Sequence, residues 1–226
     1  MNVVRVQALD EETGDILICG VATNLAGVSI VETWDTTGMR ATASHDLALE
    51  DVLIPESAVG GKLLRGAPMR QAAMCGVATW FLPLMSSVYL GIAEEARAEA
   101  YKALGTGINS NSREDVLSNV LIGQMEADYM AAEATRDCIG GRLDSDREDF
   151  VAVVKDAILM KEVITEKAIA VVDRAVQIAG GRAFYRKSPL ERLARDVRGA
   201  RFHPPAAPIS YQMAGERYRE AMGVSR

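Results

Sequence analysis

Three long stretches with helical periodicity dominate this chain and limit the folds that it can adopt. Apolar residues recur at helical spacing over about residues 67–104, 113–139 and 147–179, and short polar or glycine-rich links join them. In the second stretch the predicted core face carries Leu117, Val120, Leu121, Ala127, Ala131, Ala134 and Cys138. In the third it carries Val154, Ile158, Ile164, Ala168, Val171, Ala175 and Ile178. Long helices with short links favour an antiparallel bundle, which shorter helices from Pro189 and over 209–222 complete.

Proline and glycine mark where these helices are expected to bend or end. Pro83 lies inside the first stretch, which predicts a kink or break near Phe81 and Leu82 because proline lacks the N–H that an interior helical position needs. The pair Gly140-Gly141 predicts the end of the second helix.

The first 58 residues have the period-two pattern and the turns of β-structure. Short runs rich in β-branched residues cover 3–6, 16–21, 28–31 and 47–54. A glycine-containing turn over 10–15 predicts a hairpin between the first two, and Pro55 is expected to close the sheet region. So few strands make an incomplete sheet. We therefore predict a mostly α-helical fold with a partial β-domain over 1–58 and a helical bundle domain over 59–226.

The stretch from Ala175 to Arg198 ends one helix and begins another. Gly180 or Gly181 is expected to take the left-handed conformation that commonly ends a helix, because glycine alone adopts positive φ without steric cost. Pro189 suits the first turn of the next helix. Glu191 near its start and Arg195 near its end complement the helix dipole. Capping alone therefore accounts for the two glycines.

Charge and composition exclude several classes of function. The formal net charge of −6 argues against nucleic acid or an anionic membrane surface as a partner. No apolar run reaches membrane-spanning length, and the first residues show no secretory pattern, so a cytoplasmic protein is expected. Three widely spaced cysteines indicate reduced thiols, and two histidines in the whole chain make a zinc site an unattractive interpretation.

Two motifs resemble the acyl-CoA dehydrogenase family of flavoproteins. The C-terminal helical domain of that family carries Gln-x-x-Gly-Gly, then Leu-Glu-Arg, then Arg-Asp, and the matching residues are Gln177, Gly180, Gly181, Leu190, Glu191, Arg192, Arg195 and Asp196. The end of its middle β-domain resembles the segment with Gly38, Met39, Arg40, Thr42, Ser44, Leu47, Leu49, Val52 and Pro55. The resemblance covers the second half of the family's length. It implies a fragment, one subunit of a split enzyme or a degenerate member.

The family resemblance implies a flavin cofactor, FAD, held between subunits. Gln177, Gly180 and Gly181 would contact the dinucleotide of a neighbouring subunit's FAD. The family arginine that contacts the FAD phosphates has no match at Leu104-Gly105-Thr106, and Arg113 or Lys102 is the candidate substitute.

The family's catalytic base is also unmatched. Its usual glutamate follows the Arg-Asp pair, where this chain has His203-Pro204-Pro205, and proline has no ionisable group. The alternative family position falls near Phe81. His203 is the remaining titratable candidate, and a histidine after the Arg-Asp helix resembles the flavin-dependent monooxygenases of this fold, where it positions or deprotonates an aromatic substrate. The other interpretation is a histidine that only begins a rigid Pro-Pro turn.

Three functions follow from the resemblance. The first is α,β-dehydrogenation of an acyl-CoA thioester, with electrons passed to an electron-transfer flavoprotein. The second is flavin-dependent monooxygenation of an aromatic or sterol-derived substrate, with reduced flavin supplied by a flavin reductase. The third is a non-catalytic oligomerising scaffold. In each, a homo-oligomer (a dimer or tetramer) is expected, because the helices of the family pack between subunits.

Overall fold

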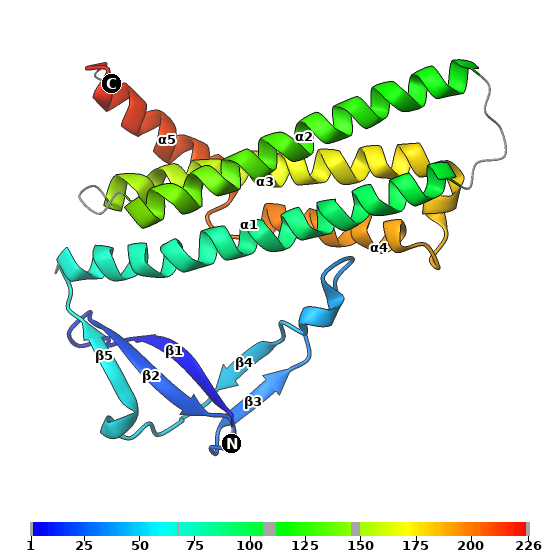
Figure 1. Ribbon diagram of the computed structural model, residues 1–226. Coiled ribbons are helices and arrows are strands. Elements are labelled where there is room, and N and C mark those ends of the chain that lie inside the picture. The colour runs from blue at the N-terminus through cyan, green and yellow to red at the C-terminus, as the bar shows by residue number, and fades with distance from the viewer. Residues whose placement is uncertain (1, 67, 106–111, 146–149, 225–226) are drawn as a thin grey trace. The chain divides into compact units, whose positions relative to one another are not determined.

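The chain divides into a β-rich unit and a helical unit (Figure 1). The computed structural model describes residues 2–66, 68–105, 112–145 and 150–224, and within these ranges the side chains of 68–78, 112–115 and 150–151 are not described. The β-rich unit contains residues 1–36 and 40–77, and the helical unit contains 37–39 and 78–226. This mostly helical fold with a small antiparallel sheet confirms the predicted fold class.

The β-rich unit contains two small antiparallel sheets. In the first, β2 (Ile16–Ala22) lies between β1 (Val3–Leu9) and β5 (Val59–Leu63). In the second, β3 (Val28–Val31) pairs with β4 (Asp46–Leu49). The predicted hairpin between β1 and β2 is confirmed, with Gly14 in its turn at φ +72°.

The expected end of the sheet at Pro55 is wrong, and so is a strand over 52–54. The chain turns after β4 through Asp51, which has a positive φ of 51°, and residues 52–55 form no strand. The sheet resumes at β5, whose sequence Val-Gly-Gly-Lys-Leu has two glycines, and glycine weakens the strand signal because it has no side chain to pack. Burial of Cys19 and Val21 on β2 places this unit's core under its central strand.

Three long helices run antiparallel in the helical unit (Figure 1). They are α1 (Pro68–Gly105), α2 (Ser112–Ser145) and α3 (Phe150–Ala179). A shared apolar core joins them to α4 (Pro189–Asp196) and to the 3₁₀ segment at Val197–Phe202. The last helix, α5 (Ala207–Ala221), contacts α3. None of the helices among the described residues is long and apolar enough to cross a bilayer.

A helix break at Pro83 and a helix end at Gly140-Gly141 are both wrong, whereas the alternative of a kink at Pro83 stays a prediction. Helix α1 continues through Pro83, and helix α2 continues through Gly140 and Gly141 as far as Ser145. A Cβ at either of these two glycines would meet no atom within 4 Å, so neither a close approach nor a positive φ requires glycine there. Long helices tolerate one weak position because their tertiary packing supplies most of their stability.

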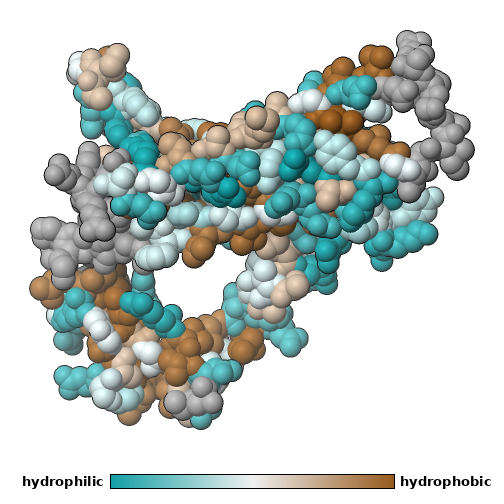
Figure 2. Space-filling view, viewed as in Figure 1, coloured by the Kyte–Doolittle hydropathy of each residue, from teal (hydrophilic) through white to brown (hydrophobic). Residues whose placement is uncertain are grey.

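The predicted core face is right for α3 and wrong for α2. In α3, Val154, Ile164 and Val171 are buried as predicted. In α2, the predicted residues Leu117 and Val120 are 62% and 51% exposed, and Met125, Tyr129, Ala132 and Ile139 are buried instead. Helix α2 has apolar residues on two faces, so periodicity could not choose between them. Figure 2 shows hydrophobic surface beside the start of α2, where Leu117 and Val120 lie exposed.

Candidate active site

His203 lies where the 3₁₀ segment after α4 ends, and it packs against helix α1. Its Nε2 atom is 2.8 Å from the Oη of Tyr89. The ring of Phe81 meets the imidazole edge to face, with 5.8 Å between ring centroids. Tyr89 and Phe81 lie two turns apart in α1 and thus on one side of the helix. The imidazole is half-buried, so one side of the ring is accessible.

A buried charge pair on α3 holds the backbone on either side of His203. The ammonium group of Lys161 donates to the carbonyl oxygens of His203 (3.2 Å) and Pro205 (2.7 Å). It also forms an ion pair of 2.6 Å with Glu162, and both side chains are almost fully buried. Ser210 of α5 donates to the same Glu162 carboxylate at 2.7 Å. All three ammonium protons therefore have acceptors, as a buried lysine requires.

The Arg-Asp pair of α4 binds the loop segment 37–39, which belongs to the helical unit. The backbone N–H of Met39 donates to Asp196 at 2.6 Å, and Arg195 donates to the carbonyl oxygen of Thr37 at 2.6 Å. A Cβ on Gly38 would lie 2.3 Å from the backbone oxygen of Arg195, so only glycine fits there. Gly38 and Met39, the first residues of one family motif, thus contact Arg195 and Asp196 of the other.

Gly199 makes room for the tyrosine hydroxyl in this cluster. A Cβ at Gly199 would lie 2.9 Å from the Oη of Tyr89 and 2.9 Å from the Cγ of Met39, closer than real Cβ contacts allow. The side chain of Tyr89 is only 1% exposed. Its hydroxyl is therefore held in one place beside His203.

The electrostatics of the cluster favour neutral groups. Burial, and secondarily the positive charge of Lys161, lowers the pKa of His203 from its usual value of 6.5. Burial, and secondarily the negative charge of Asp196, raises the pKa of Tyr89 to about 12. At neutral pH the pair is a neutral imidazole hydrogen-bonded to a neutral phenol. Among the described residues, no carboxylate bonds to either ring.

The predicted cofactor-binding residues lie at the other end of α3. Lys161 holds His203, whereas Gln177 comes 16 residues later in the same helix, about 24 Å away at 1.5 Å per residue. Gly180 follows at the helix end with φ +64°, which confirms the left-handed cap, and Gly181 is beside it. All three are exposed. Arg113 lies in α2, but its side chain is outside the described residues.

A hollow of about 650 Å³ adjoins the two glycines and fits an anionic ligand. Its lining includes Ala179 and three basic side chains, those of Lys102, Arg182 and Lys187. Glu99 also lines it and pairs with Lys102 at 2.6 Å. A Cβ at Gly180 or Gly181 would meet no atom within 4 Å, so the backbone there is open to approach. Exposed backbone beside several cations suits the phosphate of a flavin nucleotide.

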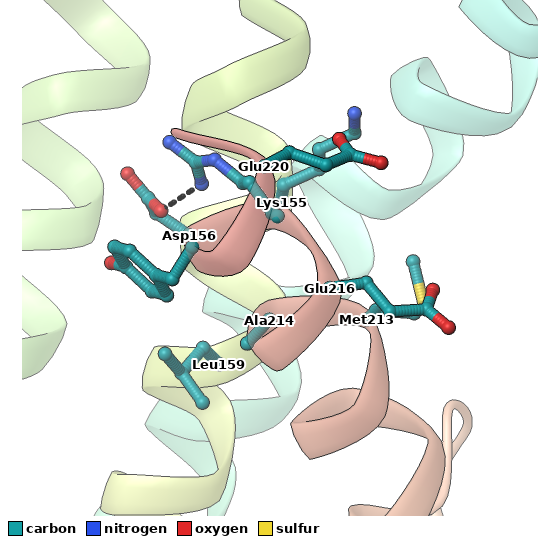
Figure 3. A pocket seen from close by; sticks show the side chains of 9 residues that line it. Lys155, Asp156, Leu159, Met213, Ala214, Glu216 and Glu220 are labelled. Carbon is teal, nitrogen blue, oxygen red and sulfur yellow. Dashed lines mark hydrogen bonds and ion pairs between the residues drawn. The ribbon is translucent and has the colours of Figure 1, made fainter. Parts of the chain in front are cut away.

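A smaller hollow of about 250 Å³ between α3 and α5 has a structural role (Figure 3). Asp156 of α3 forms an ion pair with Arg217 of α5, drawn as a dashed line in Figure 3, and a second with Arg142 of α2 at 2.8 Å. Two arginines pair with this one half-buried carboxylate. The pairs tie α2, α3 and α5 together.

The sequence predicted His203 as a candidate site residue, and it did not predict the residues that surround it in the structure. Tyr89, Lys161, Glu162 and Ser210 are far apart along the chain, and no motif links them. One signal was present: Lys161-Glu162 interrupts the apolar pattern of α3 with two adjacent charges, between the buried Ala157 and Ile164. Adjacent charges in an apolar helix indicate a buried polar contact.

This chain is similar to several known proteins in sequence and in structure. A family model described as "Acyl-CoA dehydrogenase, C-terminal domain" matches residues 84–207. YdbM of Bacillus subtilis, provisionally named an acyl-CoA dehydrogenase, is 34% identical over 79% of this chain and 46% of its own length. The amino sugar nitrososynthase RubN8 of Streptomyces rubradiris is 30% identical over 91% of this chain and 49% of its own. The chain thus spans about half the length of these relatives.

Other relatives are named isobutylamine N-hydroxylase, indole-3-acetate monooxygenase and dibenzothiophene monooxygenase. Among solved structures, KijD3 in complex with FMN and a dTDP-linked amino sugar has a TM-score of 0.78 at 22% identity, over 99% of this chain and 56% of its own. That likeness confirms the fold, and the FMN is bound by KijD3. The match over residues 84–207, with the identity to YdbM, shows that this chain belongs to the acyl-CoA dehydrogenase family.

Proposed function

We propose that this chain takes part in the flavin-dependent monooxygenation of a small aromatic or amine substrate. One observation carries the proposal: the position after the Arg-Asp helix holds the neutral imidazole of His203, supported by Tyr89 and Lys161, and no carboxylate base. The names of the nitrososynthase, N-hydroxylase and monooxygenase relatives support it.

A flavin, when bound, would supply the electrons for splitting dioxygen, with one oxygen atom entering the substrate and the other leaving as water. Gln177, Gly180 and Gly181 are the proposed cofactor contacts from the sequence, and the adjoining hollow adds Arg182 and Lys187. FMN and FAD both carry a phosphate that these cations could bind. FAD, the cofactor expected from the sequence, would also place its adenylate there.

The residues around His203 have the properties of a substrate-binding site. Phe81 offers an aromatic edge to a flat ligand, and His203 offers a polar atom from a half-buried ring. Lys161 fixes the backbone on both sides of the imidazole, which keeps its orientation constant. Tyr89, which is almost fully buried, contacts the ring at Nε2.

Acyl-CoA dehydrogenation is the second candidate, because YdbM is 34% identical and is provisionally named for it. That reaction removes a proton α to the thioester carbonyl and needs a base. Apart from His203, the nearby ionisable groups are engaged: Glu162 by Lys161 and Ser210, and Asp196 by Met39. The geometry therefore favours monooxygenation.

Assembly into a homo-oligomer is part of the same proposal. The exposed apolar residues of α2 and a second exposed row on α1 (Trp80, Leu84 and Val88, spaced four residues apart) support it. An electron-transfer flavoprotein or a flavin reductase would be the redox partner in the dehydrogenase and monooxygenase cases, respectively.

The two reactions are told apart by product analysis. The protein is given reduced FMN or FAD, oxygen and a panel of aromatic and amine compounds, and products are examined for one added oxygen atom. In parallel, the flavin-loaded protein is mixed with acyl-CoA without oxygen, and loss of flavin colour is followed. Monooxygenation predicts oxygenated product and no bleaching by acyl-CoA. Bleaching without oxygenated product would overturn the proposal.

His203→Ala tests the site itself. Loss of a positioned acid-base group typically costs about 100-fold or more in rate, so product formation is expected to fall by that order. Arg201→Ala, two residues earlier, removes an exposed ion pair with Glu166 and is the matched control. Equal activity of the two variants would show that His203 does not act on the reactants.

A further inference from the structure

The two ring nitrogens of His203 have different surroundings. Nε2 lies 2.8 Å from the hydroxyl oxygen of Tyr89, and Nδ1 has no hydrogen-bond partner among the described residues. A neutral imidazole carries one proton, on one nitrogen or the other, and the hydrogen bond at one nitrogen decides which. The direction of the Tyr89–His203 hydrogen bond therefore decides whether Nδ1, the accessible nitrogen, donates or accepts a hydrogen bond.

Tyr89 is expected to donate in this bond. Its hydroxyl is buried, and His203 is its one hydrogen-bond partner among the described residues. If the phenol accepted from Nε2–H instead, its own proton would be buried without an acceptor, which costs about 1–3 kcal/mol. Gly199 allows the hydroxyl to reach this position, and its pKa of about 12 keeps the phenol protonated at any physiological pH.

We propose that Tyr89 holds His203 as the neutral tautomer protonated at Nδ1, so that the accessible nitrogen is a hydrogen-bond donor and not a base. The tautomer follows from the geometry alone, and its use toward bound reactants rests on the proposed function. Tyr89 is then a positioning residue that acts through His203.

The charged groups around the ring support the neutral form. Lys161 of α3 is the nearest charge and disfavours an imidazolium, and its partner Glu162 is turned to Lys161 and Ser210. Asp196 of α4 acts on Tyr89 and binds the Met39 N–H. An imidazolium would also have to donate from Nε2, which would leave the phenol proton without an acceptor.

An Nδ1-protonated His203 limits the kind of reactant atom that this site can bind. An Nδ1–H donor stabilises an atom with a lone pair or a developing negative charge, such as a phenolate or carbonyl oxygen. It cannot remove a proton from a carbon acid while Tyr89 occupies Nε2. The same assignment therefore accounts for hydroxylation and argues against α-proton abstraction at this residue.

Nitrogen-15 NMR of the two imidazoles tests the tautomer without flavin or substrate. The chain has two histidines, and the second is an internal reference: Nδ1 of His45 accepts from the backbone N–H of Trp34 at 3.1 Å, so neutral His45 must be protonated at Nε2. We expect the two histidines to show opposite two-bond proton–nitrogen correlation patterns at pH 8. His45→Gln assigns the signals. An Nε2-protonated His203 would overturn the proposal.

Tyr89→Phe tests whether the Tyr89 hydroxyl sets the tautomer of His203. Without the phenol, His203 is expected to change to the Nε2-protonated pattern that free imidazoles favour. Gly199→Ala, whose Cβ would displace the Tyr89 hydroxyl, is expected to give the same change. Tyr101→Phe, which removes a hydroxyl bonded to Glu126 in the same helix, is the control and should leave the pattern unaltered. An unchanged pattern in Tyr89→Phe would refute the role of Tyr89.

The NMR spectra test the tautomer of His203 separately from the proposed monooxygenation. An Nδ1-protonated His203 in a protein that yields no oxygenated product would leave the tautomer standing and remove the proposed reaction. Oxygenated product from a protein with Nε2-protonated His203 would support the proposed reaction and overturn the proposed tautomer.

Discussion

Lys161 holds the backbone on both sides of His203, although its own side chain is almost fully buried. Its charge is buried with that of Glu162, and its remaining two protons bind the backbone around His203. A buried ion pair adds little net stability compared with apolar residues, but removing one partner leaves a buried charge without compensation. The pair is therefore best understood as fixing the position of His203.

Lys161→Met is predicted to destabilise the protein by about 3–5 kcal/mol, because it leaves the Glu162 carboxylate buried with only Ser210 as a partner. Urea unfolding measures this loss. Arg201→Met, which breaks an exposed ion pair, should change the free energy of unfolding by less than about 1 kcal/mol. A small effect of Lys161→Met, equal to that of the control, would show that the pair is solvated.

His203 is predicted to make stability depend on pH. Burial and Lys161 lower its pKa in the folded protein, so the unfolded chain takes up a proton near pH 6.5 while the folded protein stays neutral. The folded state then binds fewer protons, and stability falls as pH decreases below about 6.5 until the folded pKa is reached. Urea unfolding between pH 8 and pH 5 should show this fall, and His203→Gln should reduce it. Equal slopes in both proteins would contradict the lowered pKa.

At the scale of elements, the sequence predicted the helices well and their core faces unevenly. Helix α3 has one apolar face, so periodicity identified its buried residues, including Val171 and Ala175. Helix α2 has two, and the choice depended on neighbours that the sequence could not place. Strand β5 was missed because Gly60 and Gly61 give no strand signal, and only its pairing with β2 makes it a strand.

The two motif glycines are predicted to respond differently to alanine. Gly180 has φ +64°, and a left-handed residue other than glycine costs about 1–2 kcal/mol. Gly181 has no positive φ and open space around its Cα, so Gly181→Ala should leave stability nearly unchanged. Thermal unfolding of the two variants checks this. Equal loss in both would mean that Gly181 also has a steric role, and flavin binding by Gly181→Ala would then not report on the cofactor contact alone.

At the scale of the whole molecule, motif and family resemblance predicted the fold and the location of His203. They could not predict the residues that hold His203 in place. Tyr89, Lys161 and Ser210 come together only when α1, α3 and α5 pack around the backbone of residues 203–205. They also left the chemistry open, since the motif is shared by dehydrogenases and monooxygenases. We propose that the tautomer and charge of His203, which depend on three-dimensional contacts, favour one of the two reactions.

A flavin titration tests the proposal that this chain holds a flavin. The purified protein is titrated with FMN and with FAD while flavin fluorescence and the visible spectrum are recorded, and the mixture is then passed over a sizing column. We expect a flavin band that elutes with the protein, and weaker binding in Lys187→Gln, which removes a cation from the hollow beside Gly180. Protein that elutes without colour and leaves the fluorescence of both flavins unchanged would contradict the claim.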